Sequence, residues 1–157
     1  MKKKRVVIIS LLLLLVSVIG ISSYFLFKDK INLLDVDHSA VDWNGKKQKY
    51  TSGEENTIAI PGFEKVTLYA NETKQAVNFH NPEINDCYFK ISLIHPDGSV
   101  LWISDLIEPG KGMYSIELEK TLAVGEYENA VLKYECFSLN DQSPLNGSEI
   151  NLKLVVV

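Results

Sequence analysis

The side chains best suited to chemistry in this 157-residue sequence are two cysteines and three histidines. His38, His80 and His95 stand at no recognisable catalytic spacing from a cysteine or a serine. A serine hydrolase needs a Gly-x-Ser-x-Gly nucleophile elbow, and the chain contains none. Cys87 and Cys136 fall in phase with apolar, core-facing neighbours, so neither is expected to act as a nucleophile. We therefore expect no enzymatic activity and no catalytic residues.

A short acidic run raises the question of a metal site. Asp35, Asp37 and Asp42 lie close together in the chain and suggest calcium. Aligned to an EF-hand loop, however, the sixth position is Ala40 instead of Gly, and the twelfth is Lys46 instead of Glu. The histidines and cysteines also lack the C-x-x-C and H-x-x-x-H spacings of zinc sites. The sequence predicts no metal ion and no cofactor.

The two cysteines are candidates for a disulfide. On alternating strands, Cys87 shares a face with Phe89 and Ile91, and Cys136 shares a face with Tyr134, so both are expected to face the core. If their strands belong to different sheets, the thiols can meet across a sandwich, and an exported chain permits the bond. A bridge over 49 positions would stabilise the fold by about 4 kcal/mol. Two separate buried thiols remain the alternative.

From residue 57 onward, short segments rich in Val, Ile, Tyr and Phe alternate with turn residues. With no helical periodicity beyond a turn or two, this pattern predicts an all-β sandwich. The segments expected to contain strands are 57–63, 65–70, 75–82, 86–104, 112–122, 125–139 and 149–157. The run HPDGS, His95–Ser99, predicts a tight hairpin turn, and residues 139–149 are predicted to form the longest loop.

A family resemblance rests on three elements of this region. Cys87, Trp102 and the run Tyr134–Cys136 follow the Cys…Trp…Tyr-x-Cys layout of the immunoglobulin fold. Residues 57–157 therefore resemble an immunoglobulin-like antiparallel β-sandwich. In that family the first Cys and the Trp lie in opposite sheets, whereas the predicted hairpin keeps both in one sheet. The run GEYENAVLKYEC also resembles the Gly-x-Tyr strand start of bacterial immunoglobulin-like modules, with Glu128-Asn129 adding one residue as a bulge.

The N-terminal part predicts a membrane anchor. Residues 6–27 carry no charge, are apolar on every side and follow four basic residues. As a helix this run is about 33 Å long, enough to cross a hydrocarbon core of about 30 Å. The basic residues predict a cytoplasmic N-terminus. We predict a cytoplasmic tail (1–5), a transmembrane helix (6–27) that contacts the lipid bilayer, a stalk (28–56) and an extracytoplasmic sandwich domain (57–157).

A cleaved secretion signal is the alternative to an anchor. Val6–Ile19 has a suitable length for the apolar part of such a signal, and Gly20-Ile21-Ser22 loosely resembles a cleavage site. The apolar run continues through Tyr24–Phe27, which favours the uncleaved anchor. In either case residues 28–157 are expected to be exported.

The charge of the exported part excludes one class of partner. Four of the 16 basic residues precede residue 6, so residues 28–157 carry 12 basic and 20 acidic side chains, a net charge of −8. Such a surface is repelled by phosphate backbones, so we expect no nucleic-acid binding.

Two functions fit these observations. The first is a membrane-anchored module for interaction with another envelope or surface protein, in which strand 149–157 could add to a partner's sheet. The overall layout is similar to short, single-anchor surface proteins of Firmicutes (Gram-positive bacteria), some of them carried on mobile elements. The second is a carbohydrate-binding module, whose candidate binding surface is Tyr88, Trp102, Tyr114 and Phe137 if these aromatic side chains share one exposed face.

Overall fold

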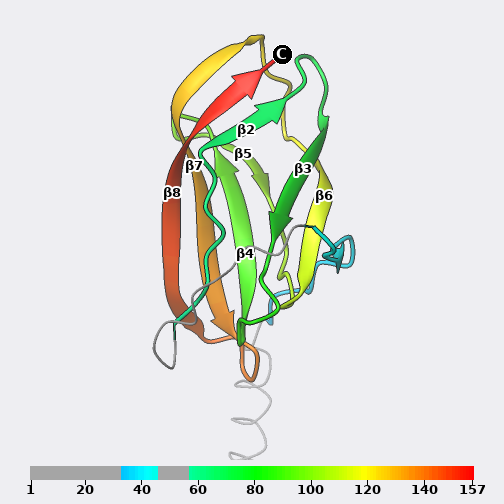
Figure 1. Cartoon of the computed structure of the whole chain (residues 1–157), viewed down its shortest axis with the longest axis vertical. Helices are drawn as coiled ribbons and strands as arrows, with labels where there is room; N and C mark the ends of the chain where they lie inside the picture. Colours follow the sequence, from blue (N-terminus) through cyan, green and yellow to red (C-terminus); the bar gives the residue numbers. More distant parts are fainter. Residues whose placement is uncertain (1–32, 46–56) are drawn as a thin grey trace, which may run out of the picture. The chain divides into compact units, whose positions relative to one another are not determined.

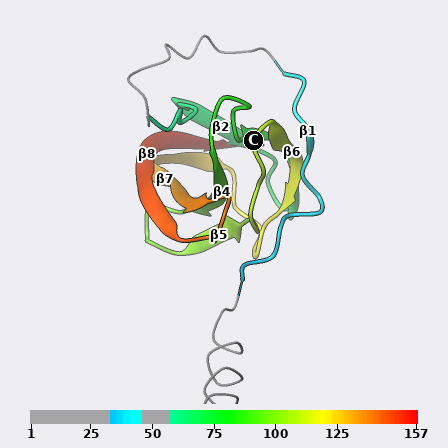
Figure 2. The same ribbon diagram turned by 90° about the horizontal axis from the view of Figure 1, so that it is seen from below.

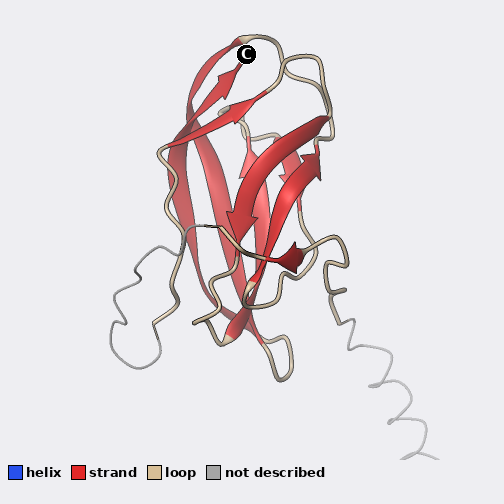
Figure 3. Ribbon diagram, turned by 45° about the vertical axis from the view of Figure 1, so that its right-hand side comes forward, coloured by secondary structure: helices blue, strands red, loops and turns tan. Residues whose placement is uncertain are grey.

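The computed structural model describes residues 33–45 and 57–157, and in these it contains strands, turns and loops only (Figure 3). The predicted all-β class is confirmed, with the strands in two sheets. Within the described ranges, the chain forms no helix long and apolar enough to cross a bilayer. The membrane helix predicted at 6–27 and most of the predicted stalk lie outside the described residues.

The larger sheet has five strands in the order β2-β8-β7-β4-β5 (Figure 1). Its strands are β2 (Lys65–Leu68), β8 (Pro144–Val156), β7 (Gly125–Ser138), β4 (Cys87–Ile94) and β5 (Val100–Ile103). β2 runs parallel to β8, and every other neighbouring pair is antiparallel. β8 therefore lies inside the sheet where β2 covers it, from Lys153 to Val156, and the predicted final strand is not a free edge there.

The smaller sheet has three strands in the order β1-β6-β3. They are β1 (Val41–Asp42), β6 (Lys111–Glu117) and β3 (Lys74–His80). Figure 2 shows the two layers from one end, with β6 and β1 opposite the layer that contains β8, β7 and β4.

The core lies between the two sheets. Every second side chain of β4 and β7 points into it. The core faces of these two strands carry Cys87, Phe89, Ile91, Leu93, Ala130, Leu132, Tyr134 and Cys136, all at most 1% exposed. The predicted inward phase is confirmed for both strands. Burying a large apolar side chain of this kind stabilises the fold by about 1.5–3 kcal/mol.

The predicted hairpin turn between β4 and β5 is confirmed. The His95 amide donates to the Ser99 carbonyl at 2.9 Å, and the Gly98 amide donates to the His95 carbonyl at 2.8 Å. Gly98 has φ +85°, a conformation that glycine adopts without steric cost. The Asp97 carboxylate accepts from the Ser99 amide at 2.8 Å. The pKa of Asp97 lies well below its usual range. Hydrogen bonds from Ser99 are the main cause, and a hydrogen bond from His95 adds to the effect.

The predicted bulge in β7 is also confirmed. Tyr127 pairs with Leu154, but the next pair is Ala130 with Leu152, so β7 contains one extra residue at this point. Asn129 takes φ +64°, which places it in the left-handed region that asparagine tolerates better than most residues.

Two predicted elements differ in the structure. Residues 57–63 form no strand; Ile58, Ile60 and Phe63 instead pack against the core, and Pro61 has no amide hydrogen to donate to a ladder. The predicted loop 139–149 is shorter than expected, because β8 already begins at Pro144. Pairing with β7 holds this Pro-, Asn- and Gly-containing stretch extended in spite of its low strand propensity.

Residues 34–45, predicted to belong to the stalk, are part of the folded unit Leu34–Val157. β1 pairs with β6, and the Asp37 amide donates to the Leu106 carbonyl at 2.8 Å. Polar composition predicts a stalk here. It gives no information about backbone hydrogen bonds, and it is through its backbone that this segment pairs with the edge of the smaller sheet.

Two buried amide side chains join the β3–β4 loop to its surroundings. Asn81 is 0% exposed, and its Nδ2 donates to the carbonyls of Cys87 at 2.8 Å and Ile107 at 2.9 Å. Its Oδ1 accepts from Nδ2 of Asn85 at 2.9 Å. Asn85 in turn exchanges two hydrogen bonds with the backbone of Ala59. Since these buried polar atoms have partners, the loop is held without the cost of a lost hydrogen bond.

Candidate functional site

The structure separates the aromatic residues predicted to form one binding surface. Trp102 is only 7% exposed and packs in the core against Phe79, with ring centroids 5.8 Å apart. Tyr114 is 38% exposed but lies on β6, in the smaller sheet, where its hydroxyl donates to Asn44. Tyr88 lies on β4, in the larger sheet. Trp102 therefore offers no exposed ring, and Tyr88 and Tyr114 belong to different sheets.

The two cysteines lie on neighbouring strands of one sheet rather than across the sandwich. Phe89 pairs with Cys136, so Cys87 is the diagonal neighbour of Cys136. Both thiols are free and 1% exposed. The pKa of Cys136 is raised, mainly by a hydrogen bond between the two thiols and, to a smaller extent, by burial. The condition that their strands belong to different sheets is not met, because β4 pairs directly with β7. The disulfide itself stays a prediction.

Two side chains of the acidic run, Asp37 and Asp42, make contacts within the fold. The Asp37 carboxylate accepts from the hydroxyl and amide of Ser39 and from the Asp105 amide. Asp42 forms an ion pair with Lys111 at 3.1 Å. Among the residues that the structure describes, no three His, Cys, Asp or Glu side chains are grouped so that they could hold a metal ion.

An aromatic clasp fastens residues 34–45 to the smaller sheet. The rings of Trp43 and His80 are stacked at 3.8 Å with an interplanar angle of 10°, and Trp43 Nε1 donates to Asn78 at 2.8 Å. A Cβ at Gly45 would lie 2.5 Å from the indole, and one at Gly112 would lie 2.8 Å from it. His80 is therefore stacked on the indole, and Gly45 and Gly112 approach it closely enough that a larger residue would clash.

The clasp predicts a pH dependence of stability. Burial lowers the pKa of His80, although a backbone hydrogen bond with Asn78 opposes the shift. The unfolded chain therefore takes up this proton more readily than the folded one, so stability is complete above the unfolded pKa of about 6.5 and falls as the pH drops below it. Urea unfolding midpoints at pH 7.5 and pH 5.5 measure the effect. We expect the loss of stability between pH 7.5 and pH 5.5 to be smaller in His80→Phe than in the unmodified chain. The same loss should persist in His38→Gln, since His38 is exposed.

The outer face of the larger sheet carries a row of ring side chains at one end. The register pairs Tyr88 with Phe137 and Phe137 with Pro144, so the three lie side by side across β4, β7 and β8. Tyr88 and Phe137 are half-buried and Pro144 is exposed. This row joins two of the predicted aromatic residues with a proline that no sequence pattern indicates.

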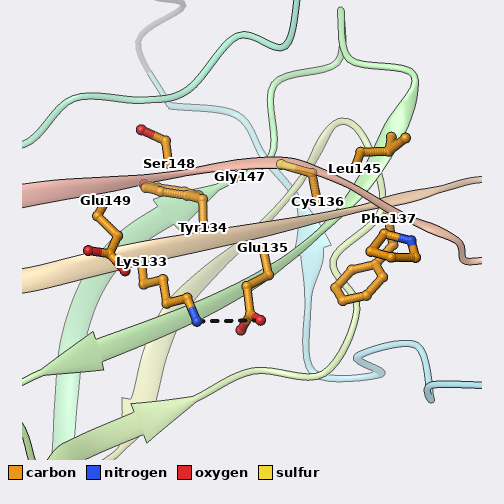
Figure 4. A pocket seen from close by; sticks show the side chains of 10 residues that line it. Lys133, Tyr134, Glu135, Cys136, Phe137, Leu145, Gly147, Ser148 and Glu149 are labelled. Atoms are coloured by element: carbon orange, nitrogen blue, oxygen red, sulfur yellow. Dashed lines mark ion pairs between the residues drawn. The ribbon is translucent and has the colours of Figure 1, made fainter.

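A cavity of about 340 Å³ borders this row, and we call it the β7–β8 groove (Figure 4). Its lining residues are Lys133, Tyr134, Glu135, Cys136, Phe137, Pro144, Leu145, Gly147, Ser148 and Glu149. The register shifts here: Tyr134 pairs with Ser148, but Cys136 pairs with Leu145, so β8 contains one extra residue. A Cβ at Gly147 would lie 2.2 Å from the Tyr134 carbonyl oxygen, so only glycine fits at this bulge.

A second surface lies at the other end of β7, and we call it the tip row: Tyr69, Val124 and Val157. Val156 pairs with both Leu68 and Gly125, and the three residues lie one position beyond these pairs, just past the ends of β2 and β8 and just before β7. They are 56%, 72% and 56% exposed. The sequence signal for this surface is the run of consecutive valines that ends the last strand. Which residues lie beside them depends on the register of β2 and β7 with β8.

The folded unit begins at the opposite end from the tip row. Gln142, in the turn between β7 and β8, accepts from the Leu34 amide at 2.6 Å and donates to the Leu34 carbonyl at 3.0 Å. β7 contains 14 residues, so the two ends are about 40 Å apart. Gln142 holds φ +56°, a conformation uncommon for a residue other than glycine.

Comparison with known proteins adds no relative. No protein family, no curated protein and no solved structure matches this chain. The features of this chain that bear on its function are the tip row, the β7–β8 groove and the sequence of the N-terminal part.

Proposed function

We propose that this chain is a membrane-anchored, extracytoplasmic, immunoglobulin-like module that binds another protein at the cell envelope and carries out no catalysis. Residues 6–27 would cross the cell membrane with the N-terminus in the cytoplasm, as their length and the preceding basic residues predict. The observation that carries the binding proposal is the tip row, three exposed apolar side chains at the end of the sandwich opposite Leu34.

The strand order supports the immunoglobulin-like part of the proposal. In variable-type immunoglobulin domains one sheet contains strands G, F, C and C′, and strands B and E pair in the other. Here β8, β7, β4 and β5 follow in that order, and β3 pairs with β6. In this correspondence Cys136 lies on the F strand as in the family, but Cys87 lies on the C strand instead of the B strand. The family's disulfide between strands B and F therefore has no equivalent here.

The surroundings of the tip row suit a protein interface. Charged side chains lie further along the same face, where Lys153 forms ion pairs with Glu126 at 2.6 Å and with Glu128 at 3.0 Å. An apolar centre beside a charged rim is the usual composition of such interfaces. Contiguous exposed apolar groups are also uncommon on proteins without partners.

Site-specific photo-crosslinking in native membranes tests the proposal. A photoreactive residue at position 124 of the full-length chain is expected to capture a discrete protein, and Tyr69→Asp should abolish the product. The control is the same photoreactive residue at position 84, where Ile84 is 59% exposed in the β3–β4 loop at the other end of the sandwich. Equal capture at both positions, or no capture at position 124, would overturn the proposal.

The anchor has its own test in the same membranes. After alkaline carbonate extraction, the full-length chain is expected in the membrane pellet. A shorter chain in the supernatant, beginning near residue 23, would show that the leader is cleaved and that the domain is secreted.

A further inference from the structure

The β7–β8 groove combines a flat apolar wall with charged groups. Phe137 and Pro144 are register partners, so their rings lie next to each other at one end of the cavity. Lys133 and Glu135 project to the same side of the strands as Phe137 (Figure 4). A volume of about 340 Å³ lies at the lower end of the range for small-molecule sites, about 300–1,000 Å³.

The charged groups of the groove are available to a ligand. Lys133 Nζ and Glu135 Oε1 are 3.5 Å apart, and their side chains are 37% and 39% exposed. An ion pair of this length and exposure contributes little to stability, so a ligand can compete for it at little cost. Glu149 is the register partner of Lys133 and is exposed. The groove therefore offers both hydrogen-bond donors and acceptors beside its ring wall.

The balance of charge restricts the ligand. Glu135 and Glu149 outnumber Lys133, and the exported part of the chain is itself acidic. Phosphates, sulfates and uronic acids would be repelled, whereas neutral or ammonium-bearing groups would be accepted.

An added peptide strand does not fit this groove. β7 and β8 pair with each other on both sides of the bulge, from Lys133 with Glu149 to Phe137 with Pro144. The backbone groups between these strands are therefore occupied, and an extended peptide could not join the ladder here. The ligand must be recognised by side chains.

We propose that the β7–β8 groove binds one or two rings of a neutral or amine-bearing saccharide. A pyranose ring has an apolar face, which would stack on Phe137 and Pro144, and a rim of hydroxyl groups, which would bond to Lys133, Glu135 and Glu149. Tyr88 extends the ring wall toward β4 and gives the next sugar of a chain a surface to lie on. This site goes beyond the protein-binding proposal and is distinct from the tip row.

The test uses the full-length chain in a detergent without a sugar headgroup. The probes are an oligomer of N-acetylglucosamine, an oligomer of glucosamine and a polygalacturonate, each titrated by isothermal calorimetry. We expect one of the first two to bind and polygalacturonate not to bind. Phe137→Ala should weaken binding about tenfold or more, because the stacking surface is lost.

Matched variants separate this site from the others. Tyr114→Ala, on the smaller sheet, and Val124→Glu, in the tip row, should bind the saccharide like the unmodified chain. If Phe137→Ala fails to fold, the surface variant Glu149→Gln replaces it, with a loss of affinity expected for the glucosamine oligomer. Absence of binding to both amino-sugar oligomers, binding that neither groove variant weakens, or tight polygalacturonate binding would overturn the proposal. Capture at position 124 is independent of each of these results.

Discussion

Replacing Asn81 by aspartate is expected to lower the free energy of unfolding by about 3–5 kcal/mol, much of the total stability of about 5–15 kcal/mol typical of single domains. Asn81 Nδ2 donates to two carbonyls, those of Cys87 and Ile107, and the side chain is 0% exposed. An ionised carboxylate cannot donate to either carbonyl, and it would be buried without a cation.

Guanidinium unfolding of the full-length chain, monitored by tryptophan fluorescence, measures this decrease in the free energy of unfolding. Because the buried carboxyl is disfavoured in its charged form, its pKa rises in the folded state, and the penalty should shrink as the pH is lowered from 7 toward 4.5. Asn151→Asp is the control, since Asn151 is exposed on β8 and should change stability little. Equal stability of the two variants at pH 7 would show that the Asn81 hydrogen bonds do not hold the β3–β4 loop.

Gly147→Ala is expected to lower the free energy of unfolding by about 1–3 kcal/mol and to change the shape of the β7–β8 groove. The added methyl group would lie 2.2 Å from the Tyr134 carbonyl oxygen and 3.5 Å from the Cα of Glu135. Both contacts are with backbone, which cannot rotate away as a flexible side chain can. The bulge must therefore shift, and Leu145 and Ser148, which flank it, must move with it.

Gly62→Ala provides the matched comparison for this substitution. A Cβ at Gly62 meets nothing within 4 Å, and its φ lies outside the left-handed region. This variant should be neutral or more stable by about 0.5 kcal/mol, because alanine reduces the entropy of the unfolded chain. Thermal unfolding midpoints compare the two variants directly. Similar midpoints would contradict the close approach at Gly147, and a saccharide titration of Gly147→Ala would show whether the groove changes with it.

The elements predicted correctly from the sequence depend on neighbours close in the chain. Alternation placed Cys87 and Cys136 on core faces, and proline, aspartate and glycine in His95–Ser99 specified the hairpin turn. The extra residue at Glu128-Asn129 was predicted from the resemblance to the Gly-x-Tyr strand start, which compares residues that are close in the chain. Each of these features follows from steric preferences within a few residues, so a single sequence contains the information.

The elements predicted incorrectly depend on contacts between distant segments. Trp102 looked available for binding, yet its ring packs on Phe79 of the other sheet. Residues 34–45 read as polar stalk, yet Trp43 stacks on His80 and fastens them to the domain. In both cases the residue type permitted exposure or burial, and a partner more than 20 positions away in the chain decided between them.

The all-β class, the inward phase of the strands, the hairpin turn at His95–Ser99 and the acidic charge of residues 28–157 follow from composition and local spacing, so they can be predicted from a single sequence. Which residues share a surface is a property of the folded chain. Strand order and register brought Tyr69, Val124 and Val157 into the tip row, and Phe137 and Pro144 into the wall of the β7–β8 groove. A shift of one residue in register would turn these side chains to the opposite face of the sheet, and register is set by the packing of the whole core.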